Sequence, residues 1–223
     1  MSSNDVNIVF FEKVSFFPQI ENDKIPTDAL LKAAKSIVDF LEMLGIAFKP
    51  VRDDIDGNIL KLKNVFQKDP NRFVTLNNIL EEEHERITDG KFKIATDALL
   101  WLTRALFYNQ LFLIEFFNDF KRCNNDEELS SLSENLNHHF EKAYELSLKR
   151  HHNWFIQKIF GVCLLAVPYR TSLLQTLGYI QNEEKINSKM QKKIIETMEL
   201  YLESLRNCNQ SLILLLKKYN FSV

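Results

Sequence analysis

The segment 91–120 reads KFKIATDALLWLTRALFYNQLFLIEFFNDF. Apolar side chains occur on almost every face of the helix that this stretch would form. A helix that is apolar nearly all round belongs in the interior of a domain, where neighbouring elements cover each face. The segment therefore predicts a central helix in a bundle of other helices.

Amphipathic helices are expected on both sides of this segment. The stretch 25–45, IPTDALLKAAKSIVDFLEMLG, has capping residues, an apolar face and a final glycine. Further helices are expected at 53–66 (DDIDGNILKLKNVF), 71–86 (NRFVTLNNILEEEHER), 150–170 (RHHNWFIQKIFGVCLLAVPYR) and 207–223 (NCNQSLILLLKKYNFSV). Only five glycines and five prolines interrupt the chain, and no strand-like alternation of any length occurs. We predict a single all-α domain.

The composition narrows the class of protein. The chain has 223 residues, 26% charged residues and a net charge of −2, which favours a soluble globular protein and argues against nucleic-acid binding. Its 18 phenylalanines predict an interior that is built from or lined by large rings. Three cysteines without CxxC spacing favour reduced thiols in the cytoplasm. Neither a signal peptide nor a transmembrane helix is expected.

The segment 53–66 places polar and apolar residues on adjoining stripes. At about 100° per residue, Asp54, Asn58 and Lys61 share one narrow stripe of a helix. The neighbouring stripe is apolar and contains Ile55, Ile59, Leu62 and Phe66. An anion, an amide and a cation thus lie in a row beside an apolar surface.

Signs of catalysis or of metal binding are weak. The chain contains no GxGxxG, GxxxxGK[ST], HExxH or GxSxG motif. The pairs His138–His139 and His151–His152 would be about 20 Å apart on one helix, too far to share a metal ion. We therefore expect no cofactor and no metal, and we expect His138 and His139 on the surface.

Two tryptophans have both a structural and a functional interpretation. Asp97, Trp101 and Arg104 share one helical face, and Trp101 either fills the core or stacks on a sugar ring. His152 precedes Trp154 and Phe155. It is either a core or rim histidine whose ring nitrogens are hydrogen-bonded within the protein, or a residue that contacts a ligand. The set Trp154, Lys158, Tyr169 and Arg170 has the ring-plus-cation composition of a membrane interface, or of an ordinary mixed surface.

Several pieces, taken in order, resemble the glycolipid transfer protein family: DDIDGNILKL, RFVTLNNILE, ALLWLTRAL, AYELSLKRHHNWFIQKIF and AVPYR. The resemblance extends from about residue 27 to the C-terminus. It implies a domain over 26–223, with 1–25 as a segment of uncertain role. It also implies a single-domain two-layer helical bundle that encloses an apolar lipid-chain pocket.

The resemblance implies a lipid carrier and not an enzyme. Such a protein binds one glycosphingolipid and moves it between membranes without energy input, in the cytoplasm and peripherally at membrane surfaces. Moving each methylene from a bilayer into water costs about 0.8 kcal/mol, so a dry pocket is required. The alternatives are a lipid-sensing scaffold or signalling module with little net transfer, and a glycosidase with Asp54 and Asp97 as paired carboxylates, for which no water-positioning motif is present.

The resemblance also implies roles for individual residues. Asp54, Asn58 and Lys61 would bind the sugar hydroxyls while Trp101 stacks on the ring, and His152 and Asp54 would bind the ceramide amide. The chain pocket would contain Phe155, Phe160, Leu106, Phe221 and Val223, and membrane docking would use Trp154, Lys158, Pro168 and Tyr169. Family members that carry phosphorylated ceramide have arginine where Trp101 stands. The carboxylate of Asp97 would repel a phosphate and could accept sugar hydroxyls, so Asp97 is expected to help bind a neutral sugar head. The alternative is that Asp97 only forms a salt bridge with Arg104 or Lys93.

The beginning of the chain allows two interpretations. The stretch 8–14, IVFFEKV, faintly resembles the two-phenylalanine acidic motif that binds endoplasmic-reticulum tether proteins. The other interpretation is a strand-like or helical segment that packs on the core. The sequence leaves both open.

Overall fold

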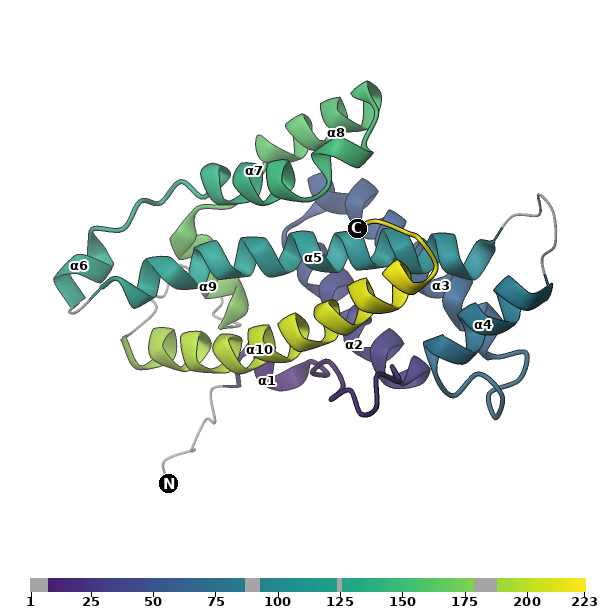
Figure 1. Ribbon diagram of the computed structural model, residues 1–223. Coiled ribbons are helices and arrows are strands. Elements are labelled where there is room, and N and C mark those ends of the chain that lie inside the picture. The colour runs from purple at the N-terminus through teal and green to yellow at the C-terminus, as the bar shows by residue number, and fades with distance from the viewer. Residues whose placement is uncertain (1–7, 87–92, 124–125, 179–187) are drawn as a thin grey trace.

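The computed structural model describes residues 8–86, 93–123, 126–178 and 188–223 (Figure 1). The helices are α1 (Phe10–Lys13), α2 (Thr27–Met43), α3 (Lys49–Phe66), α4 (Leu76–Arg86), α5 (Ile94–Lys121), α6 (Asp126–Ser130), α7 (Asn137–Leu146), α8 (Trp154–Leu164), α9 (Arg170–Leu177) and α10 (Ser188–Lys218), with 3₁₀ turns η1 (Ile46–Phe48) and η2 (Lys149–His151). Extended pairing in these ranges is limited to two isolated bridges. The prediction of a single all-α domain is confirmed.

Helix α5 is the centre of the bundle, as its sequence predicts. It packs mainly against α10, α3 and α7, with α2 and α4 also in contact (Figure 1). Phenylalanine rings fill the core around it: Phe112 lies 4.1 Å from Phe140 of α7 and 6.3 Å from Phe40 of α2, measured between ring centroids. The excess of phenylalanine is therefore used largely in the contacts between helices.

Several helix boundaries differ from those expected. Helix α4 begins at Leu76 and not near residue 71, because Asn78 accepts a hydrogen bond from Thr75 and donates one to the carbonyl of Arg72, which holds the preceding turn. Helix α8 begins at Trp154 because the side chain of Asn153 caps it by accepting from the amide of Ile156 at 3.0 Å. Helix α10 spans Ser188–Lys218 and is much longer than the stretch 207–223.

The two histidine pairs do not lie on one helix, since α7 ends at Leu146 and the turn η2 follows. His138 is exposed, as expected. The expectation that His139 lies on the surface is wrong: its side chain is 11% exposed, and its Nε2 lies 2.7 Å from Asp119. The described residues contain no cluster of side chains that could hold a metal ion.

Residues 8–25 pack on the same core as the residues that follow. Val9, Phe10 and Phe11 are at most 3% exposed, and α1 packs against α10. The amide of Phe17 donates to the hydroxyl of Ser204 at 3.2 Å. In this conformation both phenylalanines of the stretch 8–14 are buried. In the part of the chain described, no helix is both long and apolar enough to cross a membrane.

Candidate functional site

The polar stripe of α3 forms a connected row. Asn58 is only 2% exposed, and its amide nitrogen donates to the backbone carbonyl of Asp54 at 3.0 Å. Its amide oxygen accepts from the ammonium group of Lys61 at 3.1 Å. The side chains of Asp54 and Lys61 are exposed at the two ends of this row, so both can also reach a ligand.

Asp97 on α5 faces this row. Neighbouring protein atoms partly desolvate the Asp54 carboxyl, although its side chain is open to a ligand, and this desolvation raises its pKa above the ordinary value. Lys61 opposes the rise, and the charge of Asp97 adds to it. The first turn of α5 is fixed by Glu83 of α4, which accepts from the amides of Ala95 and Thr96 at 2.9 and 2.7 Å. Among the described residues Asp97 has no ion-pair partner, which leaves its carboxylate available.

His152 completes the contact between α5 and the segment before α8. Its ring lies 5.8 Å from that of Trp101 at an angle of 22°, and its Nδ1 lies 3.0 Å from the hydroxyl of Tyr144. Burial and the nearby Arg104 lower the pKa of His152, so the ring is neutral at pH 7. When Tyr144 donates to Nδ1, the proton of His152 is on Nε2, where it can be donated to a ligand carbonyl.

The sequence gives little sign of the role of Tyr144. It lies on α7, eight residues before His152, and η2 bends the chain between them. No helical spacing relates residues eight apart across such a turn, so only the structure brings these side chains together.

The pKa shifts of the histidines predict how stability depends on pH. The pKa values of His151 and His152 are lowered mainly by burial, so the folded state binds fewer protons than the unfolded state below about pH 6.5. We therefore expect the free energy of unfolding to decrease as the pH falls from 7.5 to 5.5. Urea unfolding at these two pH values measures the effect. The variant His152→Gln should show a smaller decrease, and an equal decrease would contradict the assignment to His152.

Arg104 packs on the tryptophan, and Arg150 lies near Arg104. The guanidinium carbon of Arg104 lies 4.8 Å from the centre of the Trp101 ring, and its Nη2 donates to the carbonyl of Ser222 at 2.8 Å. Arg150 donates in the same way to an oxygen of Val223. Trp101 itself is half-buried, so part of the indole remains open to a ligand. No motif or spacing in the sequence indicates a role for Arg150.

The residues predicted for the chain pocket are not equally buried. Leu106 and Phe160 are buried in the core, where the ring of Phe160 stacks on Tyr144 with 3.7 Å between centroids. Phe221 and Val223 are half-buried and pack against the core. Phe155, in contrast, is 64% exposed on α8 and is not brought together with the others.

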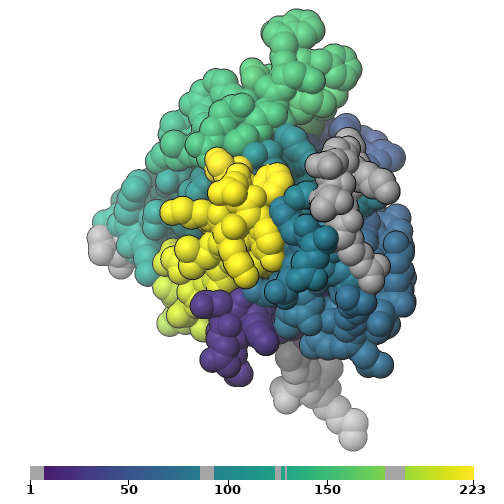
Figure 2. Space-filling model, turned by 45° about the vertical axis from the view of Figure 1, so that its right-hand side comes forward, coloured from purple at the N-terminus to yellow at the C-terminus, as the bar shows by residue number. Residues whose placement is uncertain are grey.

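Helix α8 projects from the top of the molecule (Figures 1 and 2). Trp154 and Tyr169 are 71% and 67% exposed, and Pro168 is half-buried. Lys158 is also exposed, and its Nζ lies 5.6 Å from the centre of the Trp154 ring. Further exposed apolar side chains of this region are Phe155, Val162 and Leu165 on or next to α8, and Ile46 on η1, against which α8 packs. Arg170 is not part of this surface, because it is 4% exposed and pairs with Asp119 at 2.5 Å.

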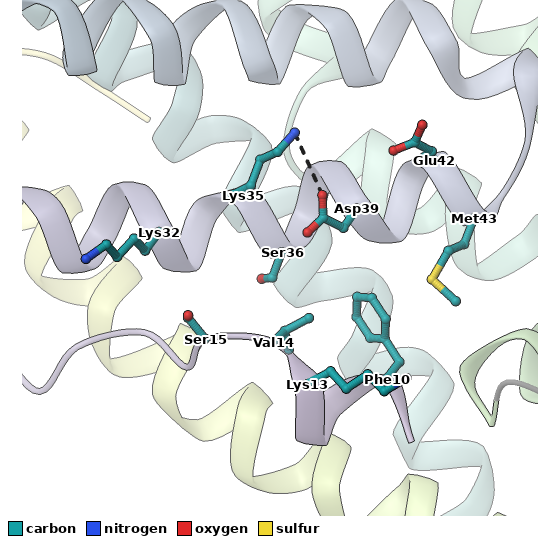
Figure 3. Close-up of a pocket in the computed structure, with 10 residues that line it drawn as sticks. All are labelled: Phe10, Lys13, Val14, Ser15, Lys32, Lys35, Ser36, Asp39, Glu42 and Met43. Carbon is teal, nitrogen blue, oxygen red and sulfur yellow. Dashed lines mark ion pairs between the residues drawn. The ribbon is translucent and has the colours of Figure 1, made fainter. Parts of the chain in front are cut away.

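A separate cavity of about 500 Å³ lies between α1 and α2 (Figure 3). Lys35 and Asp39, 3.8 Å apart, form an ion pair in its wall, and Glu42 and Lys13 also line it. Polar and charged side chains form much of this wall, so the cavity is unsuited to acyl chains. None of the residues predicted to bind a head group lines it.

The model of the glycolipid transfer protein family matches residues 25–179. The chain belongs to this family. It is 38% identical to the glycolipid transfer protein of Danio rerio over 165 residues, which cover 73% of this chain and 76% of that protein. It is 34% identical to the glycolipid transfer protein of Xenopus tropicalis over 184 residues, 81% of this chain and 85% of the relative. As a family member it is a lipid transfer protein and not an enzyme.

Several solved structures have the same fold as this protein. A structure that describes how FAPP2 selects simple glycosphingolipids superposes with a TM-score of 0.77 at 24% identity, covering 99% of this chain and 96% of the other. Mouse ceramide-1-phosphate transfer protein gives a TM-score of 0.71 at 18% identity, covering 95% and 93%. The same fold thus occurs in proteins named for two kinds of head group, so the fold alone does not decide which one this chain binds.

Proposed function

We propose that this protein binds one glycosphingolipid with a neutral sugar head and carries it between membranes. The supporting observations are that Asp54 of α3 lies near Asp97 of α5, and that Trp101, one turn after Asp97, lies 5.8 Å from the ring of His152. An indole face can cover the C–H face of a sugar, while carboxylates and amides accept and donate hydrogen bonds to its hydroxyls. This combination fits a sugar better than it fits a bare phosphate.

Charge at the site favours a neutral head. Asp54 and Asp97 are close enough for their charges to interact, and Asp97 has no ion-pair partner among the described residues. A phosphate placed beside these carboxylates would be repelled, whereas sugar hydroxyls would donate hydrogen bonds to them. Selectivity then comes from polar groups that remain unpaired when the wrong head is bound.

The ceramide amide suits the pair formed by His152 and Asp54. A neutral His152 with its proton on Nε2 donates to the amide carbonyl, and the carboxylate of Asp54 accepts from the amide N–H. The amide is a fixed feature of every ceramide, so this contact anchors the lipid whatever its sugar. Its acyl chains would then enter the apolar interior beside Leu106 and Phe160.

A fluorescent-lipid transfer assay between neutral vesicles tests this function. We expect the unchanged chain, at low concentration, to transfer monohexosylceramide much faster than phosphorylated ceramide. Equal rates for the two lipids would contradict the neutral head. Tight binding of monohexosylceramide with no net transfer would instead favour a lipid-sensing scaffold or signalling module.

The exposed surface of α8 is the proposed contact with the membrane. Tryptophan and lysine side chains suit the boundary between head groups and acyl chains, and Trp154 lies beside Lys158 there. We expect Trp154→Ala to lower vesicle binding and transfer rates about tenfold, since an exposed indole contributes on the order of 1–2 kcal/mol to apolar burial. Vesicle co-sedimentation and transfer assays measure this effect.

The matched control is Leu200→Ala, which removes another exposed apolar side chain, 58% exposed, from α10. It should leave vesicle binding unchanged. If both substitutions lowered binding equally, general hydrophobicity and not the α8 surface would be responsible.

Binding to an endoplasmic-reticulum tether protein through residues 8–14 would require α1 to leave the core. Phe10 and Phe11 are 3% and 2% exposed, and Phe11 packs 5.1 Å from the ring of Tyr201. Releasing two buried phenylalanines would cost several kcal/mol, on the order of 2 kcal/mol for each ring. The burial of α1 therefore favours a structural role for this segment.

A further inference from the structure

Two arginines converge on the last residues of the chain. Nη2 of Arg104 donates to the carbonyl of Ser222 at 2.8 Å, and Nη2 of Arg150 donates to an oxygen of Val223. Consecutive residues lie about 3.8 Å apart at their Cα atoms, so both guanidinium groups reach the same short piece of backbone. Figure 2 shows this C-terminal segment (residues 219–223, yellow) on the surface beside α5.

No Asp or Glu side chain in the described part of the chain forms an ion pair with either arginine. Arg104 contacts a backbone carbonyl and the Trp101 ring, and its buried Nε has no hydrogen-bond partner. Arg150 also donates from Nε to the ring of His151 at 3.0 Å. Burial lowers the pKa of Arg104, Arg150 lowers it further and Asp97 opposes them, so the two cations lie close enough to repel each other.

The C-terminal segment has anchors of its own. Tyr219 packs on the ring of His84 of α4 at 4.2 Å, and Phe221 meets the same ring edge-on at 6.3 Å. The amide of Phe221 donates to the carbonyl of Leu216 at 3.1 Å. Aromatic packing, and not only the two arginines, therefore holds the segment over the site.

We propose that Arg104 and Arg150 form a latent binding site for a phosphate monoester, and that the backbone oxygens of Ser222 and Val223 occupy it. Guanidinium groups bind phosphate by charge-assisted hydrogen bonds that are about twice as strong as those to neutral acceptors. A phosphate that displaced the C-terminal segment would also reduce the repulsion between the two cations. While it is docked, the segment keeps these donors from a phosphorylated head. This consequence for lipid selectivity rests on the neutral-head function proposed above.

Titration with inorganic phosphate tests the site without any lipid. The double substitution Phe221→Ala and Val223→Ala removes apolar anchors of the segment and leaves both arginines in place. At low ionic strength, calorimetry should show phosphate binding about tenfold tighter than in the unchanged chain, which corresponds to about 1.4 kcal/mol. Adding Arg150→Gln to this double variant should abolish the gain, and Leu214→Ala, an exposed position on α10, should produce none.

Lipid transfer provides the second measurement. The double variant should raise the transfer rate of phosphorylated ceramide relative to monohexosylceramide about tenfold, by the same energetic argument. Unchanged phosphate affinity, or a gain that survives Arg150→Gln, would overturn the proposal. If the unchanged chain transferred no monohexosylceramide, the proposed function would fail, yet the phosphate titration would still decide whether the latent site exists.

Discussion

The substitution Asp54→Val is expected to lower the rate of monohexosylceramide transfer at least about 100-fold. The carboxylate of Asp54 would accept hydrogen bonds both from sugar hydroxyls and from the ceramide amide, and each lost bond to a charged group costs about 1.5–3 kcal/mol. Two such losses exceed the 2.7 kcal/mol that correspond to a 100-fold change. Vesicle transfer kinetics with the purified variant measure the effect.

Folding should survive this substitution. The exposed side chain of Asp54 makes no ion pair among the described residues, and the hydrogen bond from Asn58 to Asp54 goes to its backbone carbonyl, which the substitution keeps. Because the pKa of the Asp54 carboxyl is raised in the folded protein, its ionised form slightly destabilises the fold at neutral pH, and the substitution removes this contribution to the free energy of unfolding. Circular dichroism and thermal unfolding should therefore resemble those of the unchanged chain.

Asp56→Val is the matched control, because Asp56 lies on the same helix and pairs with Lys35 at 3.3 Å on a different face. It should retain transfer within a factor of about two, as expected for an exposed ion pair worth less than 1 kcal/mol. If Asp54→Val retained rapid transfer, or if Asp56→Val lost it equally, the polar row of α3 would not be the head-group site.

Arg170→Ala is expected to cause the largest loss of stability. Arg170 is 4% exposed, pairs with Asp119 at 2.5 Å and donates from Nε to the carbonyl of Ser133 at 2.8 Å. Its guanidinium group also lies over the rings of Phe116 and Phe120, 5.5 Å from each centroid. Removing one partner of a buried ion pair costs about 3–5 kcal/mol, because the other charge stays buried. Urea unfolding should show a decrease of this size in the free energy of unfolding.

Lys142→Ala provides the comparison. Lys142 of α7 pairs at 2.8 Å with Glu115, which lies four residues before Asp119 on α5, but the Lys142 side chain is 44% exposed. Its loss should cost less than about 1 kcal/mol. Equal losses for the two variants would show that burial of Arg170 does not determine its contribution. His139 also contacts Asp119 and would retain part of the interaction, so a loss near 3 kcal/mol is more consistent with the structure than one near 5.

Much of the fold follows from local patterns in the sequence. Apolar residues on nearly every face of 91–120 predict the central helix α5. The adjoining polar and apolar stripes of 53–66 predict which side of α3 faces the core. These patterns are informative because residues three or four apart share one face of a helix wherever that helix is placed. Helix ends are less predictable: the cap at Asn153, which separates His152 from α8, depends on a single side-chain hydrogen bond.

The helical class, the central helix and the polar row of Asp54, Asn58 and Lys61 follow from the amino-acid sequence alone, because each depends on spacing within one segment. Contacts between distant segments, in contrast, are known only from the folded structure. Arg104 and Ser222 are 118 residues apart and Arg170 and Asp119 are 51 apart, yet both pairs form hydrogen bonds. Such contacts depend on how whole helices pack. Packing depends on the shape and burial of many side chains at once, and the spacing of residues within one segment does not reveal it.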